Sequence, residues 1–148
     1  MIHLESEFPF PQHLLERAAN AALVHESESL ESELSIVLTD DARLQQLNRD
    51  YLGIDAPTDV LSFPASETDP ETGVRYIGDI LISMPRAQAQ AETAGHPLES
   101  EVQLLVVHGV LHLLGHDHAE PEEKARMWTA QAEILETLGL GSIQIREE

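Results

Sequence analysis

Residues 101–118 read EVQLLVVHGVLHLLGHDH, an apolar run that carries four histidines from His108 onward. Apolar side chains occupy most positions up to Leu114, which is typical of a buried helix. Residues four apart on a helix lie on the same face, so His108 and His112 point in the same direction. Gly115 follows where a helix can end in the left-handed conformation. We therefore expect a buried helix whose histidines form its one polar stripe.

The spacing of these histidines predicts a metal site. The turn at Gly115 brings His118 back towards His108 and His112, and three neutral imidazoles favour Zn2+ or another late first-row divalent ion. Structural zinc sites usually have four protein ligands and often include cysteine, whereas this chain has no cysteine. We therefore expect a catalytic site with a metal-bound water in the fourth position. Such a metal lowers the pKa of its water to about 7.

The same segment has a second interpretation as the zinc site of a peptidase. Its ligand pattern, HxxxHxxGxxH, is the spacing of the metzincin proteases. In enzymes with the HExxH motif, the residue after the first histidine is the glutamate that acts as general base. The corresponding residue here is Gly109, which transfers no proton. The sequence therefore disfavours peptide hydrolysis by that mechanism.

Three segments carry a resemblance to a known family. His108 to His118 resembles the HGxLHLxGxDH signature of the YbeY family, whose members are metal-dependent endoribonucleases that act in ribosomal RNA maturation. Residues 57–64, PTDVLSFP, are similar to the PTDVLSFP segment of that family, and residues 78–83, GDILIS, to its GDIxIS strand. The segments stand in the expected order, the resemblance spans residues 34–138, and the three together are highly specific.

The resemblance implies a function and a set of ligands. His108, His112 and His118 are the implied metal ligands, and the cleft beside them is implied to receive single-stranded RNA. The expected protein is a zinc-dependent, single-strand-specific endoribonuclease that acts in maturation of the small-subunit rRNA 3′ end and in ribosome quality control. Its expected partners are ribosomal RNA and the ribosome or ribosome-associated proteins. A zinc metallopeptidase and a non-catalytic metal-binding factor of ribosome assembly are the alternatives.

Other residues near these motifs are candidates for substrate contact. The family usually has an arginine after the tyrosine of its N-x-x-Y segment, whereas Tyr51 is followed here by Leu52. Arg49 lies nearby in sequence, although a residue three positions away on a helix or turn need not face the same way. Asp59 and Ser62 are further candidates for contacts with the substrate.

The residues around the histidine ligands have open roles. Asp117 is the candidate general base, or else it orients a histidine ring as carboxylates often do around zinc. The sequence leaves open whether water or the RNA 2′-hydroxyl attacks. His116 stands where the family commonly has tyrosine, and we expect its side chain to lie in solvent, with substrate contact as the alternative. His96 is expected to be a turn or capping residue.

Charge argues against a protein that grips RNA by a basic surface. The chain has 8 Lys and Arg against 27 Asp and Glu, a formal net charge of −19, so nonspecific RNA binding should be weak. A dense acidic run from Glu26 to Glu33 is expected to form a solvated surface after the first helix. Four arginines either gather at the cleft or are scattered over the surface: Arg43, Arg49, Arg75 and Arg86.

Length and pattern together predict the fold class. A chain of 148 residues, 42% of them hydrophobic, can form one domain with a substantial core. Strand and helix patterns mix without strict βαβ alternation, so we expect an α+β fold: a single compact domain over residues 1–148, with a small mixed sheet, surrounding helices and the metal site on a helix of the C-terminal half. No apolar run is long enough to cross a bilayer and no secretory signal is evident, so we expect a cytoplasmic protein.

Periodicity and turn residues predict the individual elements. Strands are expected at residues 2–6, 34–39, 59–63 and 76–83, the last two joined by a polar loop over 67–73. Helices are expected at residues 11–25, 42–51 and 85–94, across the histidine segment, and from 121 to 138. Thr39 or Asp40 is expected to cap the second helix.

Overall fold

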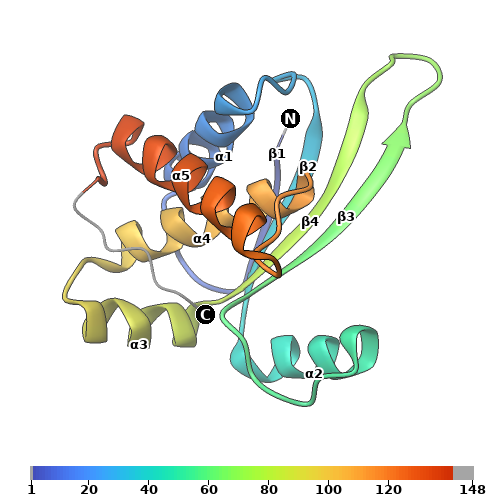
Figure 1. Ribbon diagram of the computed structural model, residues 1–148. Coiled ribbons are helices and arrows are strands. Elements are labelled where there is room, and N and C mark those ends of the chain that lie inside the picture. Colours follow the sequence, from blue (N-terminus) through green and yellow to red (C-terminus); the bar gives the residue numbers. More distant parts are fainter. Residues whose placement is uncertain (1, 142–148) are drawn as a thin grey trace.

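A computed structural model describes residues 2–141 of the chain, and each of the expected strands and helices is present in it (Figure 1). The strands are β1 (Ile2–Ser6), β2 (Glu33–Thr39), β3 (Val60–Thr68) and β4 (Arg75–Ser83). The helices are α1 (Gln12–His25), α2 (Asp41–Leu52), α3 (Met84–Ala94), α4 (Leu98–Leu113) and α5 (Pro121–Thr137).

The sheet is small and mixed, as the sequence predicts. Its strand order is β1-β2-β4-β3. β1, β2 and β4 run parallel, and β3 is antiparallel to β4. β1 and β3 therefore form the two edges of the sheet. This arrangement, with helices packed on the sheet, confirms the α+β fold class.

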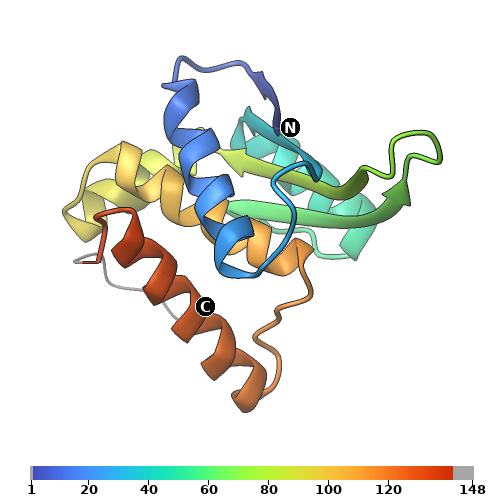
Figure 2. The same cartoon turned by 90° about the horizontal axis from the view of Figure 1, so that it is seen from above.

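The two faces of the sheet pack against different helices. Ile80 and Ile82 of β4 belong to a large core with side chains of α1, α4 and α5. Leu81 lies on the opposite face because residues alternate along a strand, and it packs with Leu44 of α2. In Figures 1 and 2 the strands accordingly lie between α2 and the pair α1 and α5. α4 and α2 are thus on opposite sides of the sheet.

α4 is the most buried helix and carries two of the expected ligands. From Glu101 to Leu113 every residue is buried except His108 and His112, which are partly exposed. The expected stripe of histidines on an otherwise buried helix is therefore confirmed. Gly115, with φ of 101°, ends the helix in the left-handed region as predicted. None of the described helices combines the length and the apolar character needed to cross a membrane.

The ends of the helices are fixed by residues that the sequence marks. Asp40 caps α2, since its Oδ1 accepts the backbone N–H of Arg43 at 2.8 Å. Pro121 opens α5. His96 lies in the turn between α3 and α4, as expected, with its Nε2 2.6 Å from Oε1 of the fully buried Glu101.

β3 is longer than its sequence pattern predicts. The expected strand ends at Phe63, but β3 continues to Thr68 and forms with β4 a hairpin that projects from the sheet (Figure 1). A register shift between Pro64 and Glu67 interrupts the pairing. The additional residues are mostly exposed and pair through their backbones. They therefore lack the alternation of apolar side chains by which a strand is recognised.

Candidate metal centre

The three histidines selected by their spacing lie together in the structure. His108 and His112 come from the second half of α4, and His118 comes from the loop between α4 and α5. One ring nitrogen of each lies within 4.8 Å of the others. The ring centroids are separated by 4.7 Å, 5.3 Å and 5.8 Å. No other group of three possible ligands of this kind occurs in the described part of the chain.

Burial keeps the imidazoles of α4 uncharged. Burial, assisted by the neighbouring His112, lowers the pKa of His108 to about 4. The pKa of His112 is also lowered, by burial and then by the nearby His118. A neutral imidazole has a nitrogen lone pair for a metal ion, whereas an imidazolium has none. These two side chains are therefore in the ligand form near pH 7.

A hydrogen bond selects the nitrogen of His108 that faces the centre. Nδ1 of His108 lies 2.9 Å from Oε1 of Gln131 on α5, a side chain that is only 2% exposed. Because the amide oxygen accepts, Nδ1 carries the proton, and the lone pair of Nε2 is available to a metal ion. Nε2 of His108 and Nε2 of His112 are 3.2 Å apart. Two nitrogens bound tetrahedrally to zinc at about 2.0–2.1 Å would be separated by roughly 3.3 Å, so the donor set fits this ion.

Gly109 brings α4 close to the sheet. A Cβ atom at this position would lie 2.8 Å from Cγ2 and 3.0 Å from Cδ1 of Ile80 on β4. These distances are shorter than the ~3.5–4.0 Å of favourable carbon–carbon contact. The glutamate of an HExxH motif therefore has no room here without a shift of the helix. Close packing of α4 on β4 thus requires a glycine at position 109. From the sequence alone, Gly109 indicates only that the general base of an HExxH enzyme is missing.

An indole ring from α5 forms one wall of the centre. The ring centroid of Trp128 lies 6.0 Å from that of His108 and 5.6 Å from that of His118, and both contacts are edge-on. Nζ of Lys124, one helical turn earlier, lies 5.9 Å from the Trp128 ring centroid. Nε1 of Trp128 is buried, and the described residues provide no acceptor for it. The centre is thus bounded by an aromatic surface with a cation nearby.

Known proteins are similar to this chain over nearly its whole length. A family model described as Endoribonuclease YbeY matches residues 5–139. The chain belongs to the endoribonuclease YbeY family. A protein named Endoribonuclease YbeY from Roseiflexus sp. is 48% identical over 133 residues, 86% of this chain and 83% of the relative. One of the same name from Chloroflexus aurantiacus is 46% identical over 145 residues, 94% of each chain.

A solved structure has the same fold. The solution structure of TM1509 from Thermotoga maritima matches with a TM-score of 0.60 at 24% sequence identity. The match covers 99% of this chain and 97% of that chain. The resemblance to the YbeY family that the motifs indicate is therefore confirmed by the family match, and the fold is shared with a solved structure.

The YbeY motifs meet on the side of the sheet that α4 covers. Ser62 of the PTDVLSFP segment pairs with Ile80 of the GDILIS segment across β3 and β4. Directly paired residues point to the same face, so Ser62 lies on the face that packs against Gly109. Asp59 is 4% exposed, and its charge is a minor cause that raises the pKa of His108. Both candidates for substrate contact therefore lie on the side of the sheet that α4 covers.

Asp117 contacts the backbone of the loop between α4 and α5. Its Oδ1 accepts the backbone N–H of His118 at 2.7 Å, and the residue is exposed. Its charge also raises the pKa of His112, against the larger effect of burial. The carboxylate thus lies next to the ligands and contacts the backbone of one of them.

The four candidate arginines are scattered over the surface, which was one of the two expected arrangements. Each has a carboxylate partner: Arg43 with Glu7 at 3.7 Å, Arg49 with Asp50 at 3.1 Å, Arg75 with Glu28 at 3.2 Å, and Arg86 with Asp41 at 2.8 Å. Arg49 lies on α2, across the sheet from α4, and Leu52 at the end of that helix is 54% exposed. The structure thus places Arg49 apart from the three histidines.

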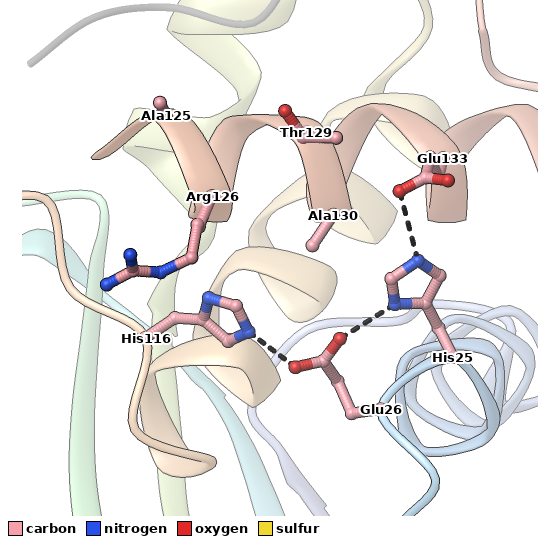
Figure 3. A pocket seen from close by; sticks show the side chains of 8 residues that line it. All are labelled: His25, Glu26, His116, Ala125, Arg126, Thr129, Ala130 and Glu133. Atoms are coloured by element: carbon pink, nitrogen blue, oxygen red, sulfur yellow. Dashed lines mark hydrogen bonds and ion pairs between the residues drawn. The ribbon is translucent and has the colours of Figure 1, made fainter. Parts of the chain in front are cut away.

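The expectation that His116 lies in solvent is wrong. Its Nε2 bonds to Oε1 of Glu26 at the end of α1, and its side chain is 20% exposed (Figure 3). The other carboxylate oxygen of Glu26 lies 2.7 Å from Nδ1 of His25. Burial raises the pKa of Glu26, but the hydrogen bonds with His116 and His25 outweigh it and hold the pKa below its ordinary value. Tertiary packing of α1 against the loop between α4 and α5 is the reason for the difference.

Glutamates of the acidic run after α1 form hydrogen bonds and ion pairs with other parts of the chain. Glu28 accepts from Ser32 at 2.9 Å and lies 3.2 Å from Arg75. Glu33 lies 3.1 Å from Nε2 of His3. Together with Glu26, these glutamates bond to β1, to β4 and to the loop between α4 and α5. Glu31 is exposed, as expected of a solvated surface, whereas Glu26, Glu28 and Glu33 are partly buried.

Three residues of the site were missed from the sequence. Gln131 carries a signal, because it is a polar residue among the buried apolar residues of α5 and so requires a buried partner. Trp128 and Glu26 carry none, since their roles depend on the packing of segments far apart in the chain. Glu26 and His116, for example, are separated by 90 positions.

Proposed function

We propose that this chain is a zinc-dependent, single-strand-specific endoribonuclease that acts in maturation of the small-subunit rRNA 3′ end and in ribosome quality control. Membership of the endoribonuclease YbeY family supports the activity. The convergence of His108, His112 and His118 carries the proposal, because three protein ligands leave a coordination position open for chemistry. Zn2+ or another late first-row divalent ion is the proposed cofactor. Residues 1–148 act as one catalytic domain.

The residues around the histidines hold and shape the proposed site. A bound zinc ion would polarise the phosphate and lower the pKa of its water to about 7. Gln131 keeps the proton on Nδ1 of His108, so that Nε2 stays available to the ion. Trp128 excludes water from one side, which strengthens the electrostatic interactions within the site.

The remaining candidate residues differ in whether their side chains would have to break existing bonds to contact the substrate. Asp117 is exposed beside His118 and is the proposed general base. Asp59 and Ser62 are proposed to contact the RNA, since they lie on the side of α4. Arg49 and His116 already bond to Asp50 and Glu26, so a contact with substrate would require these bonds to break. Attack by water and attack by the 2′-hydroxyl are both compatible with this arrangement.

The ribosome is the proposed partner. The formal net charge of −19 disfavours capture of free RNA. Presentation of the substrate on a ribosomal particle would raise its local concentration and make a basic surface on the enzyme unnecessary. With this partner, the proposed location is the cytoplasm.

Cleavage assays on the purified protein test the proposed function. The substrates are single-stranded RNA, a small-subunit rRNA with an extended 3′ end, double-stranded RNA and casein, each with and without a chelator. We expect cleavage of the first two only, loss of cleavage with chelator, and no cleavage by folded His112→Ala. Casein cleavage would support the peptidase alternative. A wild-type protein that binds zinc and cleaves nothing would support the non-catalytic assembly factor.

A further inference from the structure

A chain of four alternating histidine and glutamate side chains lies beside the loop that carries His118 (Figure 3). His116 bonds to Glu26, and the second oxygen of Glu26 lies 2.7 Å from Nδ1 of His25. Nε2 of His25 lies 3.4 Å from Oε1 of Glu133 on α5. The four side chains thus connect the end of α1, the loop between α4 and α5 (the metal-binding loop, residues 114–120) and α5 itself.

Glu26 is held on a fixed helix end. It follows the last residue of α1, and its backbone N–H donates to the carbonyl of Ala22 at 3.1 Å. Ser27 next to it adopts φ of 59°, and the N–H of Glu28 donates to the carbonyl of Leu23 at 2.9 Å. These bonds define the end of α1. The carboxylate therefore extends from a rigid element.

The conformation of the chain at His116 determines where His118 lies. The backbone N–H of His116 donates to the carbonyl of Leu111 at 2.9 Å, which returns the chain towards α4. His118 follows two residues later and is not part of a helix. Its distance from His108 and His112 therefore depends on the conformation of the loop. The bond between the side chains of His116 and Glu26 is a contact that ties this loop to α1.

We propose that Glu26 is a positioning residue of the metal centre: by holding His116, it fixes the loop so that His118 joins His108 and His112. The inference rests on the proposed metal site. A mobile loop loses conformational entropy when its ligand is immobilised, and a loop that is already ordered loses less. Glu26 thus raises the affinity for the ion while touching neither the ion nor the RNA.

The test compares Glu26→Leu with Glu26→Gln in a competition for zinc between the full chain and a chromophoric chelator. Glu26→Leu removes the acceptor, and we expect zinc binding about tenfold weaker. Glu26→Gln keeps an oxygen that accepts from His116, so its affinity should stay within about threefold of wild type. Glu133→Gln removes a charge at the opposite end of the cluster and should leave the affinity unchanged.

A double-mutant cycle shows whether the effect acts through His116. His116→Phe should weaken zinc binding as much as Glu26→Leu does, and the double variant should bind zinc no more weakly than either single variant. Urea unfolding of each metal-free variant reports its folding separately from its affinity. If Glu26→Leu does not fold, His116→Phe decides the question.

The outcomes separate this inference from the proposed function. Wild-type zinc affinity in folded Glu26→Leu and His116→Phe would overturn the positioning role and leave the metal site standing. If Glu26→Gln and Glu133→Gln each lost as much zinc affinity as Glu26→Leu, the positioning role would also be overturned. Such a result would reveal a general effect of charge. A wild-type protein that binds no zinc would overturn the metal site itself.

Discussion

His108 and His112 are the residues at which the demands of folding and of ligand binding meet. Both are only partly exposed on α4, and burial lowers the pKa of each. An uncharged imidazole suits a metal ion, but its exclusion from solvent makes protonation costly. The stability of the metal-free protein should therefore report on these two side chains.

The metal-free protein is expected to lose stability in mild acid. The folded-state pKa of His108 is about 4 against an ordinary value of 6.5, so the unfolded chain takes up the proton first. The free energy of unfolding then falls as the pH drops from about 6.5 to about 4, and it is fully retained above that range. At about 1.4 kcal/mol per pKa unit, His108 contributes a loss on the order of 3 kcal/mol. Urea unfolding between pH 7.5 and pH 4 measures it.

His108→Asn is the control for this pH dependence. The variant lacks the imidazole and should show a smaller loss of stability over the same pH range, while the contribution of the carboxylates remains. Identical pH dependence in the variant and in the wild type would contradict the assignment of a buried, neutral His108.

Gly109→Ala is expected to destabilise the protein. The added methyl group would lie 2.8 Å from Cγ2 of Ile80. Overpacking of this kind costs about 1–3 kcal/mol, partly offset by the roughly 1 kcal/mol by which alanine favours a helix. Urea unfolding of Gly109→Ala, Ile80→Ala and the double variant measures the coupling. Ile80→Ala should cost less in the Gly109→Ala background, and additive costs would contradict the close packing.

Single residues could be predicted from the sequence where spacing along one helix fixes their geometry. His108 and His112 are four residues apart, and Gly115 marks the turn that returns His118. The role of Arg49 could not be predicted in this way, because it depends on which face of the sheet α2 covers. The partner of His116 lies 90 positions away, beyond any local pattern.

At the scale of elements, α5 completes the site that α4 begins. It provides Gln131, which bonds His108, and Trp128, which lies against His108 and His118. Its core residues, including Met127 and Ile134, attach it to the main core. The position of α5 should therefore influence the affinity for metal as well as stability.

Gln131→Leu tests the contribution of α5. Removal of the acceptor for Nδ1 of His108 frees the ring to rotate or change tautomer, and we expect zinc affinity to fall about 10- to 100-fold. Gln131→Glu keeps an acceptor and should lose less. Chelator competition measures both variants. Undiminished zinc affinity in Gln131→Leu, with normal unfolding, would exclude the proposed role of this side chain.

Elements with a buried face could be predicted from the sequence, and elements held by backbone pairing alone could not. α4 and β4 are recognisable because their apolar side chains follow the demands of burial. The outer part of β3 beyond Phe63 is mostly exposed, so its side chains show no pattern. The placement of α2 across the sheet from α4 likewise depends on tertiary packing.

At the scale of the whole molecule, charge opposes the proposed substrate. The formal net charge is −19, and Arg43, Arg49, Arg75 and Arg86 each have a carboxylate partner. Four of the eight Lys and Arg residues therefore already form ion pairs and are less available to replace the counterions of RNA. Recognition should depend on the metal centre and on presentation of the RNA by its partner, and little on long-range attraction.

Binding of free single-stranded RNA should therefore be weak and only slightly dependent on salt. Each phosphate neutralised by a protein cation contributes about −0.7 to the slope of log K against log salt for single strands, and we expect a total slope no steeper than about −2. Fluorescence anisotropy of a labelled oligonucleotide on catalytically inactive His112→Ala, from 50 to 300 mM salt, measures it. A slope of about −5 or steeper would reveal an extended basic surface.

The most direct test of the central claim is the rate of RNA cleavage as a function of the zinc bound per chain. Metal-free protein is titrated with zinc, and bound zinc and cleavage of single-stranded RNA are measured in the same samples. We predict that cleavage rises in proportion to bound zinc up to one ion per chain, and that folded His118→Gln shows neither tight zinc binding nor cleavage. Full cleavage by the metal-free protein, or by His118→Gln, would contradict the claim.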